Sequence, residues 1–174
     1  LFGTTLSHYC VLADQWGVET LKEWHRDLRD RGIRVVRGNS MVKDLVVQGI
    51  CDMGFTDTDD AFAAVDAGAN VTILPVRLKN QETICLPNSV AMIARCRHPE
   101  AARRFIDFVL SEETELQLAA GVGRQIPIGS VDETRLSAEL RPLRRWADDA
   151  VPLLEAASFH AVVEEWLSAE STGQ

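Results

Sequence analysis

The chain has 174 residues, of which 46% are hydrophobic and 25% are charged, and its formal net charge is -8. A chain of this length and apolar content can bury a core, so the composition excludes a disordered protein. No apolar run approaches the roughly 18 residues of a membrane-spanning helix. The acidic balance also argues against a nucleic-acid partner, because binding to a phosphate backbone needs clustered basic residues.

Helical and extended patterns alternate in the first half of the chain. Apolar spacing and helix-ending glycines predict helices at residues 7–31, 38–49 and 61–67. Asn39 or Ser40 is the expected N-cap of the second of these helices. Short apolar runs predict strands at 33–36, 51–56 and 71–74. This order of elements predicts an α/β fold with right-handed crossovers.

The second half is expected to be mostly helical after an extended stretch at 83–93. An amphipathic helix begins at His98 and has an apolar side formed by Ala102, Phe105, Ile106 and Val109. Ser111 is the expected N-cap of the next helix, which ends near Gly121. Further helices are expected at 141–154 and 158–167, with Trp146, Phe159 and Trp166 as packing anchors.

The four cysteines are widely spaced, at positions 10, 51, 85 and 96. No C-x-x-C pair occurs, which argues against a zinc site. Three of the cysteines lie in apolar surroundings that favour buried small side chains. The spacing leaves open whether any two of them form a disulfide.

Three polar segments are candidates for a ligand site, because ligands of open α/β sheets bind where strands end and helices begin. Thr5 and Ser7 lie at the start of the first helix, and Asn39 at the start of the second. Backbone N–H groups and short polar side chains at such positions hold anions. The third segment is the acidic turn Asp57–Asp60. Each segment also has a purely structural interpretation, as the cap of the helix that follows it.

Several longer runs carry a resemblance to a known family. They are Gly38–Val46, Gly49–Asp60, Leu86–Ile93, His98–Ser111 and Gln125–Ile128. These runs resemble the extracellular solute-binding proteins of ABC importers, and among them the iron(III)-binding, ferric-transferrin-like branch. The resemblance covers the chain from Gly3 to about Ile128.

This resemblance implies a type II periplasmic-binding-protein fold: an α/β, three-layer lobe with a mixed, mostly parallel sheet flanked by helices. The whole chain, 1–174, would be one such lobe, with 1–82 as the core of the second lobe. Residues 83–128 would form the hinge-crossing strand and the helices that return toward the first lobe, and 129–174 the C-terminal helices. The first lobe would be largely absent, so we expect the chain to be part of a longer protein.

The implied function is that of a binding component without catalysis. The protein would capture a metal ion such as iron(III) together with a synergistic anion, or a small polar solute, by hinge closure. It would work in the periplasm or outside the cell and deliver its cargo to the membrane permease of an ABC transporter. A dimer of the chain through its truncated face is a further expectation.

The family's site residues map onto few positions of this chain. Its anion-binding loop corresponds to Thr5 and Ser7, together with Asn39. Its iron-binding tyrosine pair corresponds to Asp59 and Asp60, which are harder ligands acceptable to iron(III), Ca²⁺, Mg²⁺ or Mn²⁺. With Asp57, these acids could instead bind the donor groups of an organic cation or a polyol.

Two other classes of function are compatible with parts of the sequence. The run Met53–Asp59 matches the nucleophile loop of haloacid-dehalogenase-like phosphatases, in which Asp57 would attack phosphorus and Asp59 would act as acid and base beside Mg²⁺. Against this, the loop follows the second predicted strand, and no downstream Lys with an acidic pair is evident. A helical interaction domain at 98–168 is the other alternative.

Overall fold

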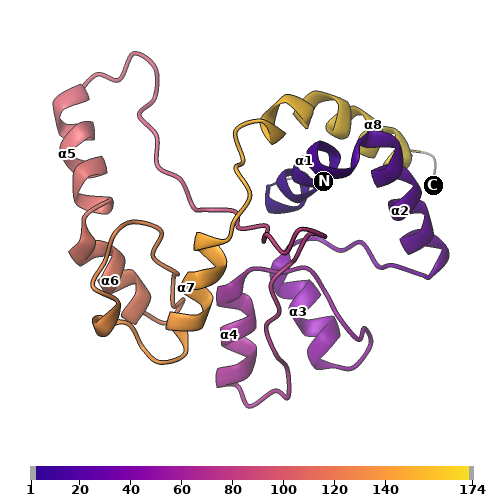
Figure 1. The fold of residues 1–174 in the computed structure, drawn as a ribbon, viewed down its shortest axis with the longest axis horizontal. Helices are drawn as coiled ribbons and strands as arrows, with labels where there is room; N and C mark the ends of the chain where they lie inside the picture. Colours follow the sequence, from indigo (N-terminus) through magenta and orange to yellow (C-terminus); the bar gives the residue numbers. More distant parts are fainter. Residues whose placement is uncertain (1–2, 173–174) are drawn as a thin grey trace. The chain divides into compact units, whose positions relative to one another are not determined.

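The computed structural model describes residues 3–172, and the chain is 54% helical. Its α-helices are α1 (Thr4–Trp16), α2 (Val18–Asp30), α3 (Asn39–Val47), α4 (Thr58–Asp66), α5 (Pro99–Val109), α6 (Glu112–Ala120), α7 (Leu140–Asp148) and α8 (His160–Thr172) (Figure 1). Two short 3₁₀ helices, η1 (Glu133–Arg135) and η2 (Ala156–Phe159), complete the set. Between residues 3 and 172 the only β pairing consists of two isolated bridges, Arg77 with Thr83 and Thr83 with Ala150.

The expected α/β lobe with a mostly parallel sheet is therefore wrong. The runs at 33–36, 51–56 and 71–74 are extended but pair with no neighbouring strand in the described part of the chain. Each run has a largely exposed apolar side chain: Val35 is 68%, Met53 84% and Leu74 77% exposed. A strand forms only where a second strand meets it, and a short apolar run does not show whether such a partner exists.

The helical region predicted at 7–31 is two helices separated by Gly17. This glycine has φ 82° and ψ 151°, and it ends α1 and begins α2. Its N–H donates to the carbonyl of Ala13, and its own carbonyl accepts from Leu21 N–H. A residue with a side chain rarely adopts such a positive φ, so glycine suits the break.

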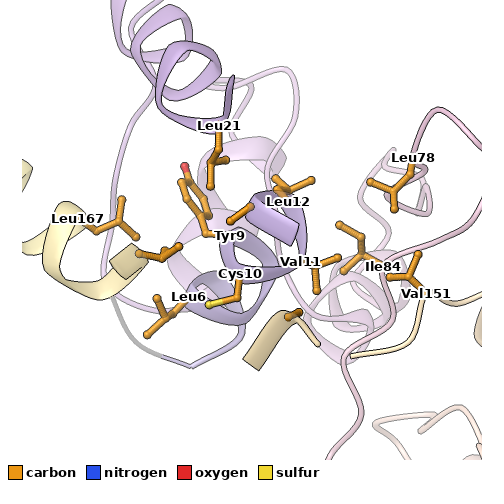
Figure 2. Close-up of a cluster of buried hydrophobic side chains, with 13 residues drawn as sticks. Leu6, Tyr9, Cys10, Val11, Leu12, Leu21, Leu78, Ile84, Val151 and Leu167 are labelled. Atoms are coloured by element: carbon orange, nitrogen blue, oxygen red, sulfur yellow. The ribbon is translucent and has the colours of Figure 1, made fainter. Parts of the chain in front are cut away.

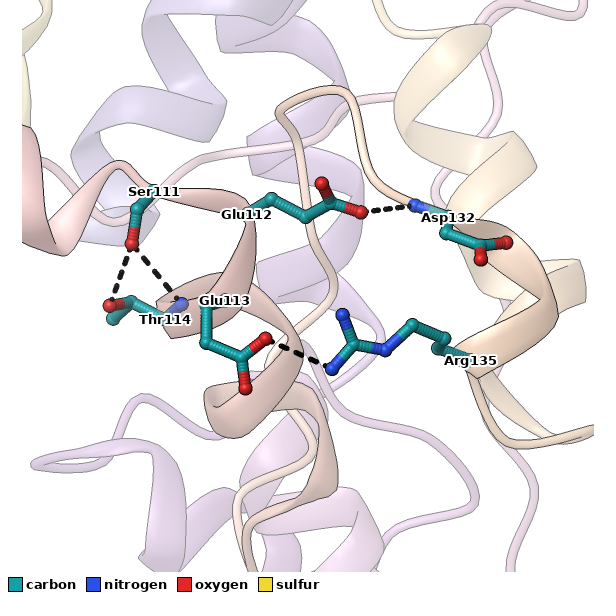
Figure 3. A network of polar contacts seen from close by, with 6 residues as sticks. All are labelled: Ser111, Glu112, Glu113, Thr114, Asp132 and Arg135. Carbon is teal, nitrogen blue, oxygen red and sulfur yellow. Dashed lines mark hydrogen bonds and ion pairs between the residues drawn. The ribbon is translucent and has the colours of Figure 1, made fainter.

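Most of the other helices lie where the local signals placed them. Ser111 caps α6 as expected, because its Oγ accepts from the backbone N–H of Thr114 at 3.3 Å (Figure 3). By contrast, α3 begins after Gly38, and neither Asn39 nor Ser40 caps it. The helix predicted at 141–154 is shorter and ends at Asp148.

The described chain divides into two compact units. Among the described residues, the first comprises 3–37, 76–86 and 150–172, and the second comprises 38–75 and 87–149. Each unit has its own apolar core. Both are assembled from segments that are distant in the sequence, so each is described separately below.

The core of the first unit is built around α1, whose side chains from Leu6 to Ala13 include six buried residues. Leu21 of α2 and Val163 of α8 are fully buried against this helix, and the segment around Ile84 completes the cluster (Figure 2). Burying each of these aliphatic side chains contributes about 1.5–3 kcal/mol. The expected anchors Phe159 and Trp166 do pack against this core.

The core of the second unit is smaller. It consists of Phe62, Leu116, Ala119, Leu136, Leu140 and Leu143, and Trp146 packs against it as expected. An ion pair between Glu113 and Arg135 at 3.0 Å helps to hold η1 beside the start of α6 (Figure 3). The expected apolar side of α5 is only partly covered: Ala102, Ile106 and Val109 are half-buried, whereas Phe105 is 59% exposed.

Among the described residues, the four cysteines form no disulfide bond. Cys10 is buried, as the apolar surroundings predicted, whereas Cys51, Cys85 and Cys96 are half-buried. Among the helices of residues 3–172, none is long and apolar enough to span a membrane.

Candidate functional site

The first turns of α3 and α4 meet in the second unit. Asn39 begins α3, and its side-chain Nδ2 donates to the carboxylate of Asp57, the residue before α4. The next residue of α3, Ser40, donates from its Oγ to Oδ1 of Asp60, the third residue of α4, at 2.8 Å. Thr56 Oγ1 donates to the backbone carbonyl of Asn39 at 3.2 Å. These contacts join the two polar segments into one cluster, which we call the α3–α4 polar cluster: Asn39, Ser40, Thr56, Asp57, Asp59 and Asp60.

Asp57 occupies the N-cap position of α4 without acting as its side-chain cap. Its backbone is extended, with φ -85° and ψ 159°, and its side chain makes no capping hydrogen bond. The carboxylate is directed to Asn39 instead. The purely structural interpretation of Asp57 as a cap therefore does not describe its side chain.

The electrostatics of the cluster disfavour the charged form of Asp57. Burial raises the pKa of this carboxyl, and the nearby charges of Asp59 and Asp60 raise it further. The hydrogen bond from Asn39 acts in the opposite direction and lowers the pKa, but burial has the larger effect. A group that brings positive charge or strong hydrogen-bond donors to Asp57 would relieve this penalty.

The other two acids of the cluster differ in exposure. Asp60 is half-buried and is held by Ser40, with Lys43 close enough to interact with it electrostatically. Lys43 itself is paired with Asp44 at 2.8 Å. Asp59 is exposed and lies near the loop after α6, since a Cβ placed on Gly123 would be 3.8 Å from the Asp59 Cβ.

Thr5 and Ser7, the other predicted ligand residues, belong to the first compact unit and lie within α1. The backbone N–H of Ser7 donates to the carbonyl of Gly3 at 3.2 Å, and its hydroxyl contacts the same oxygen at 3.4 Å. Thr5 is half-buried. The α3–α4 polar cluster is thus built without these two residues.

The donor set of the cluster does not fit a bound metal ion. In the part of the chain that the structure describes, no three His, Cys, Asp or Glu side chains gather in a way that could hold a metal. Asp57 and Asp60 are each engaged by a neutral side chain of α3, and only Asp59 of the three acids projects freely from the surface. Asp59 and Asp60, predicted as metal ligands, therefore do not form a complete cation site by themselves.

Sequence reasoning missed Ser40 and Thr56 as members of the cluster. Ser40 belongs to the polar segment predicted at the start of α3 but was not itself a predicted ligand residue, and Thr56 was predicted only as the last residue of a strand. Their position directly beside Asn39 and Asp57 was the available signal. This position identifies the two residues as members of the cluster only when the starts of α3 and α4 are known to meet.

Comparisons of this chain with protein-family models, with curated proteins and with solved structures found no match.

Proposed function

We propose that this chain is the substrate-binding component of an ABC importer and that its α3–α4 polar cluster captures a small organic cation or polyol. The runs that resemble solute-binding proteins include Asn39 and the turn Asp57–Asp60. The observation that carries the proposal is the contact of Asn39 with Asp57 between the starts of two helices. We infer the transport role from the resemblance to solute-binding proteins, and the class of solute from the chemistry of the cluster.

The solute class follows from the balance of charges and hydrogen bonds. Asp57 is half-buried beside two further carboxylates, and a single side-chain amide compensates it. An ammonium group or several hydroxyl donors placed there would stabilise the ionised form of all three acids. An anionic solute would meet repulsion from the same groups.

An organic solute fits this arrangement better than a metal cargo. A hard cation such as iron(III) requires several oxygen ligands converging on one point, whereas two of the three acids here already accept hydrogen bonds from Asn39 and Ser40. A flexible organic cation can contact the carboxylates one at a time. We therefore propose an organic solute, rather than a metal ion, as the cargo.

A thermal-shift measurement on the full chain tests the proposal. Putrescine and glycerol are the probes, and we expect at least one of them to raise the melting temperature in the wild type. The shift should be largely lost in Asp57→Asn, which keeps an oxygen acceptor for Asn39 and removes the charge. The matched control is Asp52→Asn, at an exposed aspartate outside the cluster, which should keep the full shift.

Three outcomes would contradict the proposal. The first is the absence of a shift with both probes, and the second is an equal loss in the two variants. The third is a shift with ferric citrate alone, which would indicate a metal cargo instead. For a cationic solute, binding should weaken as the pH falls through the raised pKa of Asp57, because the protonated carboxyl carries no charge.

An activity assay distinguishes the phosphatase alternative from the proposed binding function. An Asp57 nucleophile would hydrolyse p-nitrophenyl phosphate in the presence of Mg²⁺, and Asp57→Asn would abolish the turnover. A binding component produces no nitrophenol in either form. Turnover that depends on Asp57 would overturn the transport proposal.

A further inference from the structure

A groove of about 580 Å³ lies between α2 and α8 in the first unit, whereas the α3–α4 polar cluster belongs to the second unit. One wall consists of Lys22, His25, Arg26 and Arg29, which are spaced so that they form a single stripe along α2. The other wall includes Trp166 and Glu170 of α8. A groove of this size lies in the range that small-molecule ligands occupy.

The floor of the groove is rigid and aromatic. His25 is buried, with 6% of its surface exposed, and its Nδ1 shares a hydrogen bond of 2.7 Å with the hydroxyl of Tyr9. The ring of Trp166 meets that of His25 edge to face, with 5.3 Å between the ring centroids. Trp166 is half-buried, so part of its indole remains available to the groove.

Charged side chains of both signs line the groove. Three cationic side chains line it against two carboxylates, those of Asp30 and Glu170. Burial lowers the pKa of His25, so this ring is neutral and adds no charge. An anion in the groove would therefore have to pair with the lysine or with one of the two arginines.

Arg26 is the cation that is free to bind a ligand. Lys22 is already paired with Glu19 at 2.8 Å, and Arg29 with Glu170 at 2.5 Å. Arg26 is exposed at the groove, and no ion-pair partner for it is found among residues 3–172. A guanidinium group binds a carboxylate through two parallel hydrogen bonds, which a compact ammonium cannot do.

We propose that this groove is a second ligand site, which binds a small aromatic carboxylate. The carboxylate pairs with Arg26, and the flat apolar ring lies against the indole of Trp166. The binding is independent of the proposed function, because the groove and the α3–α4 polar cluster share no residue. Neither of these two contacts suffices for binding by itself. Acetate can pair with Arg26 but has no ring to lie against Trp166, and benzyl alcohol has the ring but no charge to pair with Arg26.

The test is a titration of the full chain with benzoate, followed by the indole N–H signals in NMR spectra. We expect a dissociation constant on the order of a millimolar, as for other ligands of this size. The indole signal of Trp166 should move with benzoate, while that of Trp146, which packs in the other unit, should stay in place. Acetate and benzyl alcohol should each bind at least tenfold more weakly.

Two arginine variants complete the test. Arg26→Gln should weaken benzoate binding about tenfold, since it removes a charged hydrogen-bond partner at an exposed site. Arg31→Gln, at an exposed arginine just beyond the end of α2 that does not line the groove, is the matched control and should bind like the wild type. Failure of benzoate to move the Trp166 signal, equal effects of the two variants, or equal binding of acetate and benzoate would each overturn the proposal.

Discussion

At the scale of single residues, the pair Tyr9 and His25 shows how burial tunes chemistry. Tyr9 is the one tyrosine of the chain, and it packs among Trp24, Trp166 and His25 with 8% of its surface exposed. Burial of the phenol raises its pKa to about 12. Its hydroxyl is nevertheless satisfied, because it shares a hydrogen bond with His25.

This pair leads to a prediction about alkaline pH. The folded pKa of Tyr9 lies above its unfolded value, so its contribution to stability is complete below the unfolded pKa and is lost as the pH rises toward about 12. Phenolate absorbance, which reports Tyr9 alone, should titrate near 12 in the folded chain and about two units lower in denaturant. Identical titration midpoints of the phenol in the folded chain and in denaturant would contradict the burial of Tyr9.

Removing the hydroxyl tests the hydrogen bond itself. Tyr9→Phe leaves the buried Nδ1 of His25 without its partner, and we expect it to lower the free energy of unfolding by about 1–2 kcal/mol. Urea denaturation of the two proteins measures this difference. An unchanged midpoint would mean that water replaces the hydroxyl at no cost.

Asp57 gives a second prediction at the scale of single residues, for a carboxyl group whose pKa burial also raises. Its folded pKa is raised mainly by burial, so the folded chain holds this proton more tightly than the unfolded chain does. Stability from this group is therefore greatest at acidic pH and is lost as the pH rises through the folded pKa. Asp57→Asn should raise the free energy of unfolding at neutral pH by up to about 0.5 kcal/mol, and this gain should shrink on acidification. Denaturation curves at several pH values measure it, with Asp52→Asn as the control.

At the scale of elements, the helices follow local signals and the breaks between them follow glycine. Gly17 separates α1 from α2, and Gly38 stands at the start of α3; both have positive φ values. The α6 cap is set by Ser111, whose side chain reaches the third residue of its helix. These features need no contact from a distant segment, which explains why helix positions were largely predictable.

The break at Gly17 can be tested by substitution. An added Cβ would meet no atom within 4 Å, so Gly17→Ala would be strained by its backbone conformation alone. We expect a loss of about 1 kcal/mol in the free energy of unfolding, measured by urea denaturation. Gly123→Ala is the control: its φ is not positive and its Cβ would make only ordinary contacts, so it should be neutral or slightly stabilising. Equal effects of the two changes would contradict the strain.

At the scale of the whole molecule, both compact units are discontinuous in sequence. The first needs α1, α2, the segment 76–86 and the C-terminal helix together, and the second closes around α4, α6 and α7. The segments 31–38 and 87–98 contain no helix or strand, and their side chains are mostly exposed. Such segments open at low free-energy cost.

Limited digestion with trypsin tests this difference between segments. The earliest cuts should follow Arg34 and Arg37 in the first segment and Arg95 and Arg97 in the second, before any cut inside α2, α5 or α7. Mass spectrometry of the first fragments identifies the sites. Early cleavage within α2 would contradict the packing of that helix.

Within the site, the sequence predicted the participants better than their arrangement. Asn39 and Asp57 were chosen because polar side chains at helix starts can hold ligands, and both lie in the cluster. The predicted reason, a shared edge of a parallel sheet, is wrong because there is no sheet among the described residues. The contact between them crosses 18 positions of the chain, and nothing local to either residue specifies it.

The sequence by itself determined the positions of most helices and the cap at Ser111, because each depends on residues within one or two turns, whereas the break of 7–31 at Gly17 was not predicted. Tertiary structure alone decided that the extended runs stay unpaired, that α5 leaves Phe105 exposed, and that Asn39 meets Asp57. These outcomes depend on which distant segments come together. Short stretches of apolar or polar residues carry too little information to select one partner among many.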